Sequence, residues 1–147
     1  MTIPKIKAPN GFFFKVRYVK YHSYDSNLDR RENRMFRGVD HISVTLHEKD
    51  SRRQIGYVHL VKTGKKNWFE THSSLLAQYW NRGFGVKLYG RAIQLCLENN
   101  YRVRSSMSPS ADAERLWRSK SLSNLFIIKP RRNDISQAWY AFAKEQS

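Results

Sequence analysis

The sequence predicts a mixed α+β fold, a single domain over residues 1–147 with a central, mostly antiparallel sheet of about six to seven strands flanked by helices. Three observations lead to this expectation. Apolar and polar residues alternate through much of the first half of the chain, which is typical of strands with one buried face. Apolar residues then recur at helical spacing over residues 85–99. Short apolar segments after residue 100 indicate that the chain returns to the sheet.

Four strands are predicted in the first half. They cover residues 11–21, 40–48, 54–63 and 68–77. The second alternates most clearly, because Ile42, Val44 and Leu46 fall on one face. Short polar turns join the last three strands, and this favours an antiparallel meander.

The second half mixes helices and strands. The helix over 85–99 ends at Asn99-Asn100, since Asn tolerates the left-handed conformation of a helix C-terminus. A short strand follows over 101–107, and Ser108-Pro109 has the hydroxyl cap and proline of a helix start. That helix is expected to pack through Ala113, Leu116 and Trp117. Residues 125–128 and 135–142 should return to the sheet, although the second segment also fits a terminal helix.

Charge is the unusual feature of the composition. The chain has 27 Lys+Arg against 12 Asp+Glu, a net charge of +15, with 40% hydrophobic and 14% aromatic residues to form a core. Its one cysteine excludes an internal disulfide, as suits a reducing compartment. No apolar run approaches the roughly 20 residues of a membrane span, and residues 1–10 lack the apolar region of a secretory signal. We therefore expect a cytoplasmic protein without a membrane partner.

The loop Arg82-Gly83-Phe84-Gly85 joins the fourth strand to the helix and predicts an anion site. Glycines allow a close backbone approach to a ligand, and the free amides at a helix N-terminus attract negative charge. A pyrophosphate is the natural ligand for such a cradle. Two glycines alone also fit a plain strand-to-helix turn.

The order of elements around this loop resembles motif A of the GCN5-related N-acetyltransferases, the GNAT superfamily. Its loop pattern, Gln/Arg-x-x-Gly-x-Gly/Ala, is matched from Arg82 to Val86, with Lys87 at the last position, and Leu75-Leu76-Ala77 match the preceding strand. Downstream, a helix, the strand YRVRSS and a helix with Ala113 to Trp117 also fit. The resemblance is strongest over residues 55–122 and implies a GNAT-like fold.

This resemblance implies a site for acetyl-CoA and no metal. The strand before the loop would offer backbone groups to the pantetheine arm, the loop amides would hold the pyrophosphate, and an acceptor amine would attack the thioester directly. The implied cofactor-binding residues are Leu75, Leu76, Ala77, Arg82, Gly83, Phe84, Gly85, Val86, Lys87, Leu88 and Ser110.

Three positions depart from the family pattern. Lys87 stands where Gly or Ala is usual, and its side chain could crowd the diphosphate or point outward as an added cation. Trp117 stands where many members have a Tyr that protonates the leaving thiolate, and an indole N–H cannot act as that acid. Ser110 replaces an Asn that often contacts the cofactor.

Glu70 and His72 are the candidate catalytic residues. They share a parity in the fourth strand, where some family members place a catalytic Glu, so both should face one side of the sheet. The alternative is a solvent-facing Glu and His at the start of a strand. His41, His47 and His59 show no pairing in the sequence, and Cys96 lies on the apolar side of a helix, so no metal site is expected.

The excess of basic residues predicts a second kind of partner. Residues 22–38, which could form a short helix or a mobile flap, contribute Arg30, Arg31, Arg34 and Arg37, and the C-terminal region adds Arg131 and Arg132. Clustered cations with interleaved aromatics suit nucleic acid or an acidic protein, whereas a solubilising surface is the plain alternative.

Two functions therefore compete. The first is an acyltransferase that moves an acetyl group from acetyl-CoA to an amine of an unknown acceptor. The second is a catalytically impaired GNAT-like binding module that uses its basic surface.

Overall fold

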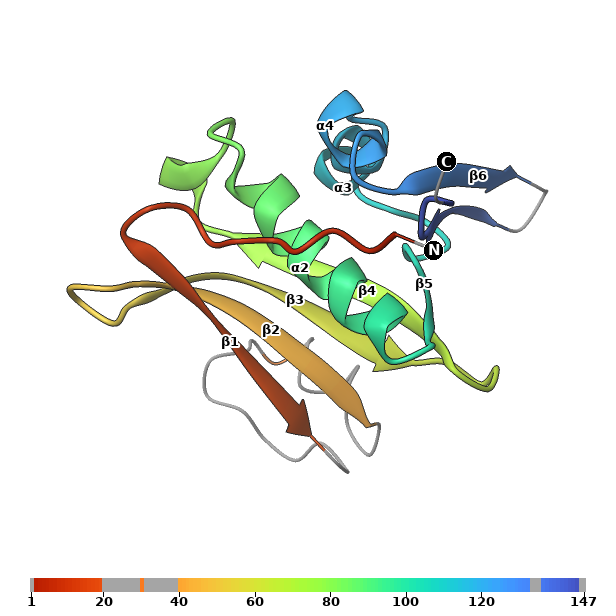
Figure 1. Ribbon diagram of the computed structural model, residues 1–147, viewed down its shortest axis with the longest axis horizontal. Helices are drawn as coiled ribbons and strands as arrows, with labels where there is room; N and C mark the ends of the chain where they lie inside the picture. The colour runs from red at the N-terminus through yellow and green to blue at the C-terminus, as the bar shows by residue number, and fades with distance from the viewer. Residues whose placement is uncertain (1, 20–29, 31–39, 133–135, 146–147) are drawn as a thin grey trace.

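The structure is a computed structural model that describes residues 2–19, 30, 40–132 and 136–145. It confirms the mixed α+β fold, with a 7-stranded sheet in the order β1-β2-β3-β4-β5-β7-β6 (Figure 1). Neighbouring strands are antiparallel except β4 and β5, which are parallel. The strands are β1 (Phe12–Val19), β2 (His41–Glu48), β3 (Gln54–Lys62), β4 (Trp68–Leu75), β5 (Arg102–Arg104), β6 (Ile127–Arg132) and β7 (Gln137–Phe142).

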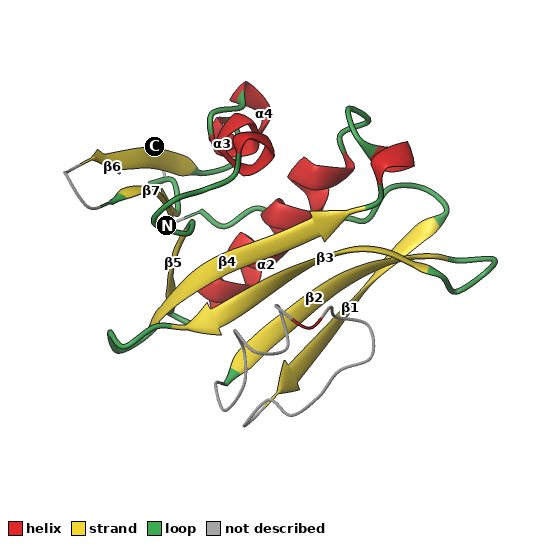
Figure 2. Ribbon diagram, turned by 180° about the vertical axis from the view of Figure 1, so that it is seen from behind, coloured by secondary structure: helices red, strands yellow, loops and turns green. Residues whose placement is uncertain are grey.

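Helix α2 (Phe84–Glu98) lies across one face of the sheet, and Figure 2 shows the molecule from the other side. Two short helices, α3 (Ala111–Trp117) and α4 (Lys120–Ser123), lie beside the β6–β7 hairpin. The N-terminal segment runs along α2, where the Ile6 N–H donates to Gln94 Oε1 at 3.1 Å. Thr2 and Lys144 form an antiparallel bridge, so the described ends of the chain lie side by side.

The core lies between the sheet and α2. Its most buried members include Val44, Val58 and Leu60 on the strands and Ala92 and Ile93 on the helix, all fully buried. The alternation predicted for residues 40–48 is the reason, because Ile42, Val44 and Leu46 share the face that α2 covers. Cys96 belongs to this core, and burial raises the pKa of its thiol to about 12.

Several element bounds differ from prediction. β4 ends at Leu75, two residues early, because the 3₁₀ helix η1 (Ala77–Tyr79) follows, in which the Tyr79 N–H donates to the Leu76 carbonyl at 2.9 Å. β5 is only three residues long, and the segment after it turns toward α3. The last apolar segment forms strand β7, so the terminal-helix alternative is wrong.

The start of α3 was also predicted wrongly. Ser110, rather than Ser108, is the N-cap, and its hydroxyl accepts a hydrogen bond from the Ala113 N–H at 3.2 Å. Pro109 therefore precedes the cap. Both sites satisfy the preference for a hydroxyl before a helix, and the sequence offered two serines within three residues.

Candidate active site

The parallel strands β4 and β5 separate after a short contact. Their pairing covers Trp68↔Arg102, Phe69↔Val103 and Glu70↔Arg104 and stops there. The rest of β4, residues 71–75, remains paired with β3 on its other side. The edge of β4 that faces β5 is therefore open beyond Glu70.

A pocket of about 430 Å³ lies beside this open edge. Volumes of this size are typical of ligand sites. Its walls come from the end of β4, the loop after η1, the first turns of α2, and α3. The lining residues are Ser73, Ser74, Leu75, Trp80, Asn81, Gly83, Gly85, Val86, Leu88, Tyr89, Ser110, Asp112, Ala113, Arg115, Leu116 and Ser119.

The N-terminus of α2 is open toward a ligand. Gly83 is its N-cap, with φ of 81° in the left-handed region, and no side chain caps the helix. The Lys87 N–H donates to the Gly83 carbonyl, so the amides of Phe84, Gly85 and Val86 have no partner within the helix. The first turn contains no acidic residue. The arrangement favours an anion, because both the amides and the helix dipole present positive charge.

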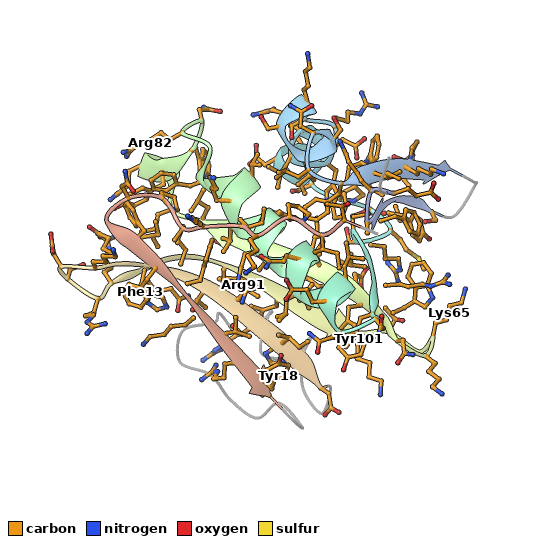
Figure 3. All side chains as sticks on the ribbon, in the orientation of Figure 1. Phe13, Tyr18, Lys65, Arg82, Arg91 and Tyr101 are labelled. Atoms are coloured by element: carbon orange, nitrogen blue, oxygen red, sulfur yellow. The ribbon has the colours of Figure 1, made fainter. Side chains whose placement is uncertain are left out.

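Aromatic packing holds this loop in place. The Phe84 ring is buried between Phe12, at 4.8 Å, and Tyr79, at 5.4 Å between ring centroids. The Arg82 guanidinium lies over the Phe84 and Tyr79 rings, at 5.1 and 5.5 Å from their centroids, at the end of the molecule marked in Figure 3. Arg82 and Phe84 thus contact the back of the loop, and neither lines the pocket.

The predicted cofactor residues divide into two groups. Those that line the pocket are Leu75, Gly83, Gly85, Val86, Leu88 and Ser110, and those that do not are Leu76, Ala77, Arg82, Phe84 and Lys87. Leu76 and Ala77 fall outside because β4 has already ended. The strand instead meets the pocket at Ser73, Ser74 and Leu75, and the Leu75 carbonyl accepts a hydrogen bond from Trp80 Nε1 at 2.7 Å.

The three departures from the family pattern have distinct positions. Lys87 is exposed and lies outside the pocket lining. The Ser110 hydroxyl is engaged in capping α3. Trp117 is 1% exposed, and its indole packs edge-on against Tyr89 at 5.9 Å within the core.

Tyr89 and Ser73 form a contact that sequence reasoning missed. Tyr89 lies on α2, Ser73 on β4, and their hydroxyl oxygens are 2.5 Å apart in the pocket wall. Burial raises the pKa of Tyr89 above its ordinary value, against the opposite effect of hydrogen bonds with Ser73 and Thr71. The phenol therefore stays protonated at neutral pH. In the sequence, Tyr89 fits the apolar spacing of the helix as its neighbours do. No pattern therefore marked it as a residue of the site.

Glu70 and His72 lie together on the sheet face opposite α2. His72 Nε2 is 3.4 Å from Glu70 Oε2, and Arg104 Nη1 donates to Glu70 Oε1 at 3.1 Å. Burial raises the pKa of Glu70, but the hydrogen bond with His72 and the charge of Arg104 lower it by more, so the pKa lies below its ordinary value. This cluster of an ionised carboxylate, an imidazole and a guanidinium lies where β4 and β5 separate.

The same face carries a histidine contact that the sequence did not reveal. The His41 and His59 rings stack at 5.1 Å, and His59 Nε2 lies 3.3 Å from Ser43 Oγ. Both histidines are buried. In the described residues no group of three or more His, Cys, Asp or Glu side chains could hold a metal ion.

The residues predicted to bind a polyanion are described only in part. Arg31, Arg34 and Arg37 lie outside the described residues, and Arg30 is exposed. Arg131 and Arg132 are the last two residues of β6. No helix in the described ranges is long and apolar enough to cross a membrane.

Solved structures with a similar fold are acetyltransferases. The ribosomal-protein-S18-alanine N-acetyltransferase from Escherichia coli matches with a TM-score of 0.56 at 9% identity, covering 92% of this chain and 96% of that one. A GNAT-family acetyltransferase from Bacillus anthracis matches with a TM-score of 0.55 at 11% identity, covering 95% and 96%. Mutant forms of a spermidine/spermine N-acetyltransferase from Vibrio cholerae match with a TM-score of 0.52 at 12% identity, covering 87% and 92%.

Sequence comparison adds nothing to this, since no protein-family model and no curated protein matches the chain. The structural likeness, at these identities, is a likeness of fold. It agrees with the loop motif from Arg82 to Lys87. This protein has the fold of the GNAT acetyltransferases.

Proposed function

We propose that this protein transfers an acetyl group from acetyl-CoA to an amine of an acceptor. The observation that carries the proposal is the pocket at the open edge of β4, which ends on the uncapped amides of α2. Three further observations support it: the GNAT fold, the absence of an acid in the first turn of α2, and the phenol of Tyr89 in the pocket wall.

The residues present fit acetyl-CoA. The amides of Phe84, Gly85 and Val86 would hold its diphosphate, as they do anions in general. The edge of β4 at Ser73 would face the pantetheine arm, and Val86, Leu88 and Leu116 supply apolar wall. Lys87 does not obstruct this pocket, because it lies outside the lining. Bound acetyl-CoA supplies an activated thioester as the electrophile.

Two side chains would move the protons. His72, held by Glu70, lies outside the pocket lining on the other face of the sheet, and would act across the open edge of β4. There it would accept the proton that the acceptor amine loses as its nitrogen bonds to the acetyl carbon. Tyr89 donates its hydroxyl proton to the sulfur as the carbon–sulfur bond breaks, a role that the buried indole of Trp117 cannot fill. Solvent then returns a proton to Tyr89 and removes one from His72.

Calorimetry with acetyl-CoA tests the proposal. We expect binding of acetyl-CoA and of CoA, and much weaker binding of pantetheine, which lacks the diphosphate. Release of free thiol that depends on an added amine would then establish transfer. The absence of both heat and a thermal shift at millimolar acetyl-CoA would rule the function out.

The acceptor is not set by the neighbours in fold, since their names specify a ribosomal-protein alanine in one case and spermidine or spermine in another. The binding-module alternative rested on Lys87 and Trp117. Lys87 lies outside the pocket lining, and Tyr89 would supply the acid that Trp117 cannot. A cytoplasmic location and a nucleic-acid or acidic-protein partner stay predictions of the sequence.

A further inference from the structure

A group of basic and aromatic side chains lies beside the Glu70–His72 cluster, on the same face of the sheet. Trp68, Glu70 and His72 share the parity that points away from α2, and the register places Arg102 opposite Trp68. Tyr140 is paired with Arg104 on one side and with Lys129 on the other. We call Lys65, Trp68, Arg102, Lys129 and Tyr140 the basic aromatic surface.

Ring contacts connect these side chains. Lys65 Nζ lies over the Trp68 ring at 5.3 Å from its centroid, and Arg102 Cζ lies over it at 5.4 Å. The Tyr140 ring meets Trp68 edge-on at 5.3 Å. Cation–π contacts of this kind hold two positive charges near each other that would otherwise separate. Lys65 extends from the β3–β4 turn at the end of the sheet (Figure 3).

These cations lack acidic partners among the described residues. Lys65, Arg102 and Lys129 are exposed, and none forms an ion pair with an acidic side chain in the described residues. Other arginines differ, because Arg104 pairs with Glu70, Arg115 with Asp112 and Arg118 with Glu114. A cluster of uncompensated positive charge attracts anionic partners and repels cationic ones.

We propose that the basic aromatic surface binds a carboxylate-rich peptide segment of the acceptor, and so presents that peptide's amine to His72. This inference rests on the proposed function, because it assigns an acceptor to the same site. The surface borders the cluster through Arg104, which contacts Glu70 and pairs with Tyr140. An acceptor held there has its negative charges close to the group that takes the amine proton.

Two features favour a peptide over a nucleic acid. Peptides carry aliphatic amines, which are good nucleophiles, whereas the amino groups of nucleobases are conjugated with the ring and attack thioesters poorly. Single-stranded nucleic acids also bind by stacking bases on open aromatic rings. Lys65 and Arg102 already lie over the Trp68 ring, so a base stacking there would compete with them.

Three 12-residue peptides with a free α-amine provide the test, identical except for four glutamates, four glutamines or four arginines. With acetyl-CoA, we expect kcat/KM for the glutamate peptide to exceed that for the glutamine peptide about tenfold, through KM, and the preference to fade at high salt. The double variant Lys65→Glu with Arg102→Glu should remove the preference and shift it toward the arginine peptide. Such a reversal is a gain that misfolding cannot produce.

The matched control is Lys49→Glu with Arg53→Glu. Both residues are exposed, and they lie at the β2–β3 turn, at the other end of β3 from Lys65. The control makes the same change in net charge and should keep the preference for the glutamate peptide. Loss of the preference in this control as well would assign it to overall charge and overturn the proposal.

Other outcomes separate the two proposals. Acetylation of all three peptides at equal kcat/KM would overturn the acidic acceptor and leave the acetyltransferase. If acetyl-CoA does not bind, the proposed function fails, and fluorescence polarisation of the labelled glutamate peptide still tests the surface. A 12-nucleotide oligouridylate that displaces this peptide and depends on Lys65 and Arg102 would overturn the peptide in favour of nucleic acid.

Discussion

The two helices whose N-termini border the pocket begin in opposite ways. At α3, the Ser110 hydroxyl accepts from the Ala113 N–H, and Asp112 and Glu114 place negative charge in the first turn. At α2, Gly83 offers no side chain and the first turn has no acid. Both termini carry partial positive charge, but at α3 the protein's own hydroxyl and carboxylates already compensate it. The difference teaches that the absence of a cap, more than the presence of glycine, marks the terminus that is open to a ligand.

An acidic residue in the first turn of α2 should make its N-terminus resemble that of α3 and weaken ligand binding there. In Gly85→Asp, a carboxylate stands where the diphosphate would bind, and a unit charge at about 4 Å costs roughly 4 kcal/mol at a partly exposed site. We expect acetyl-CoA affinity to fall about 1,000-fold by calorimetry. The melting temperature should hold or rise, because an acid near a helix N-terminus stabilises it.

Gly64→Asp is the matched control for charge. Gly64 lies between β3 and β4, nothing stands within 4 Å of a Cβ added there, and its φ is not positive. It should leave acetyl-CoA affinity unchanged. Equal losses of affinity in both variants would mean that net charge, rather than the α2 terminus, governs binding.

The sequence predicted the sheet and α2 well because both depend on periodicity. The alternation around Val44 and the helical spacing of residues 85–99 each record which face is buried. The pocket was predicted only at the loop, through Gly83 and Gly85. Its other walls come from α3 and from Tyr89, which belong to segments that meet only in three dimensions. Leu76 and Ala77 were misplaced because the 3₁₀ helix η1 follows the strand directly, and the alternation of residues did not mark its start.

The pairing of Glu70 and His72 could be predicted because side chains two apart share a face of a strand. Arg104, which holds Glu70, could not, since parallel pairing of β4 with β5 joins residues 34 positions apart. Likewise, the excess of cations was plain in the composition. Which of them lack acidic partners follows only from the ion pairs that the fold forms.

If the N-terminus of α2 binds acetyl-CoA, then replacing the proposed base His72, which lies outside it, should lower the rate of transfer and leave acetyl-CoA affinity unchanged. His72→Gln keeps a polar side chain but no longer accepts a proton, and loss of a general base typically costs about 100-fold or more in rate. We expect kcat to fall by about that factor, measured by thiol release with an amine acceptor. Acetyl-CoA affinity should stay within about twofold by calorimetry.

A fall in acetyl-CoA affinity as large as the fall in kcat would contradict this division of roles. Arg30→Gln serves as a control for a change to Gln at an exposed residue away from the pocket lining. It should change neither quantity if the acceptor does not contact residue 30.

At α3, the cap should matter for stability rather than for binding. Ser110→Ala leaves the Ala113 N–H without its partner, and such losses cost about 1 kcal/mol of unfolding free energy. Denaturant unfolding should detect this, and Ser110→Asp should restore it because an Asp carboxylate caps equally well. A fall of more than tenfold in acetyl-CoA affinity with Ser110→Ala would instead give this hydroxyl a direct contact with the ligand.

The smallest effect is expected at Lys87, where the family pattern has a small residue. Its side chain is exposed and outside the pocket lining, so Lys87→Ala should change acetyl-CoA affinity less than about threefold. A cation in the first turns of a helix opposes the dipole, and its removal should stabilise α2 by a few tenths of a kcal/mol. A tenfold loss of affinity that diminishes at high salt would show that Lys87 reaches the diphosphate, and α2 would then hold its anion with a side chain as well as with its amides.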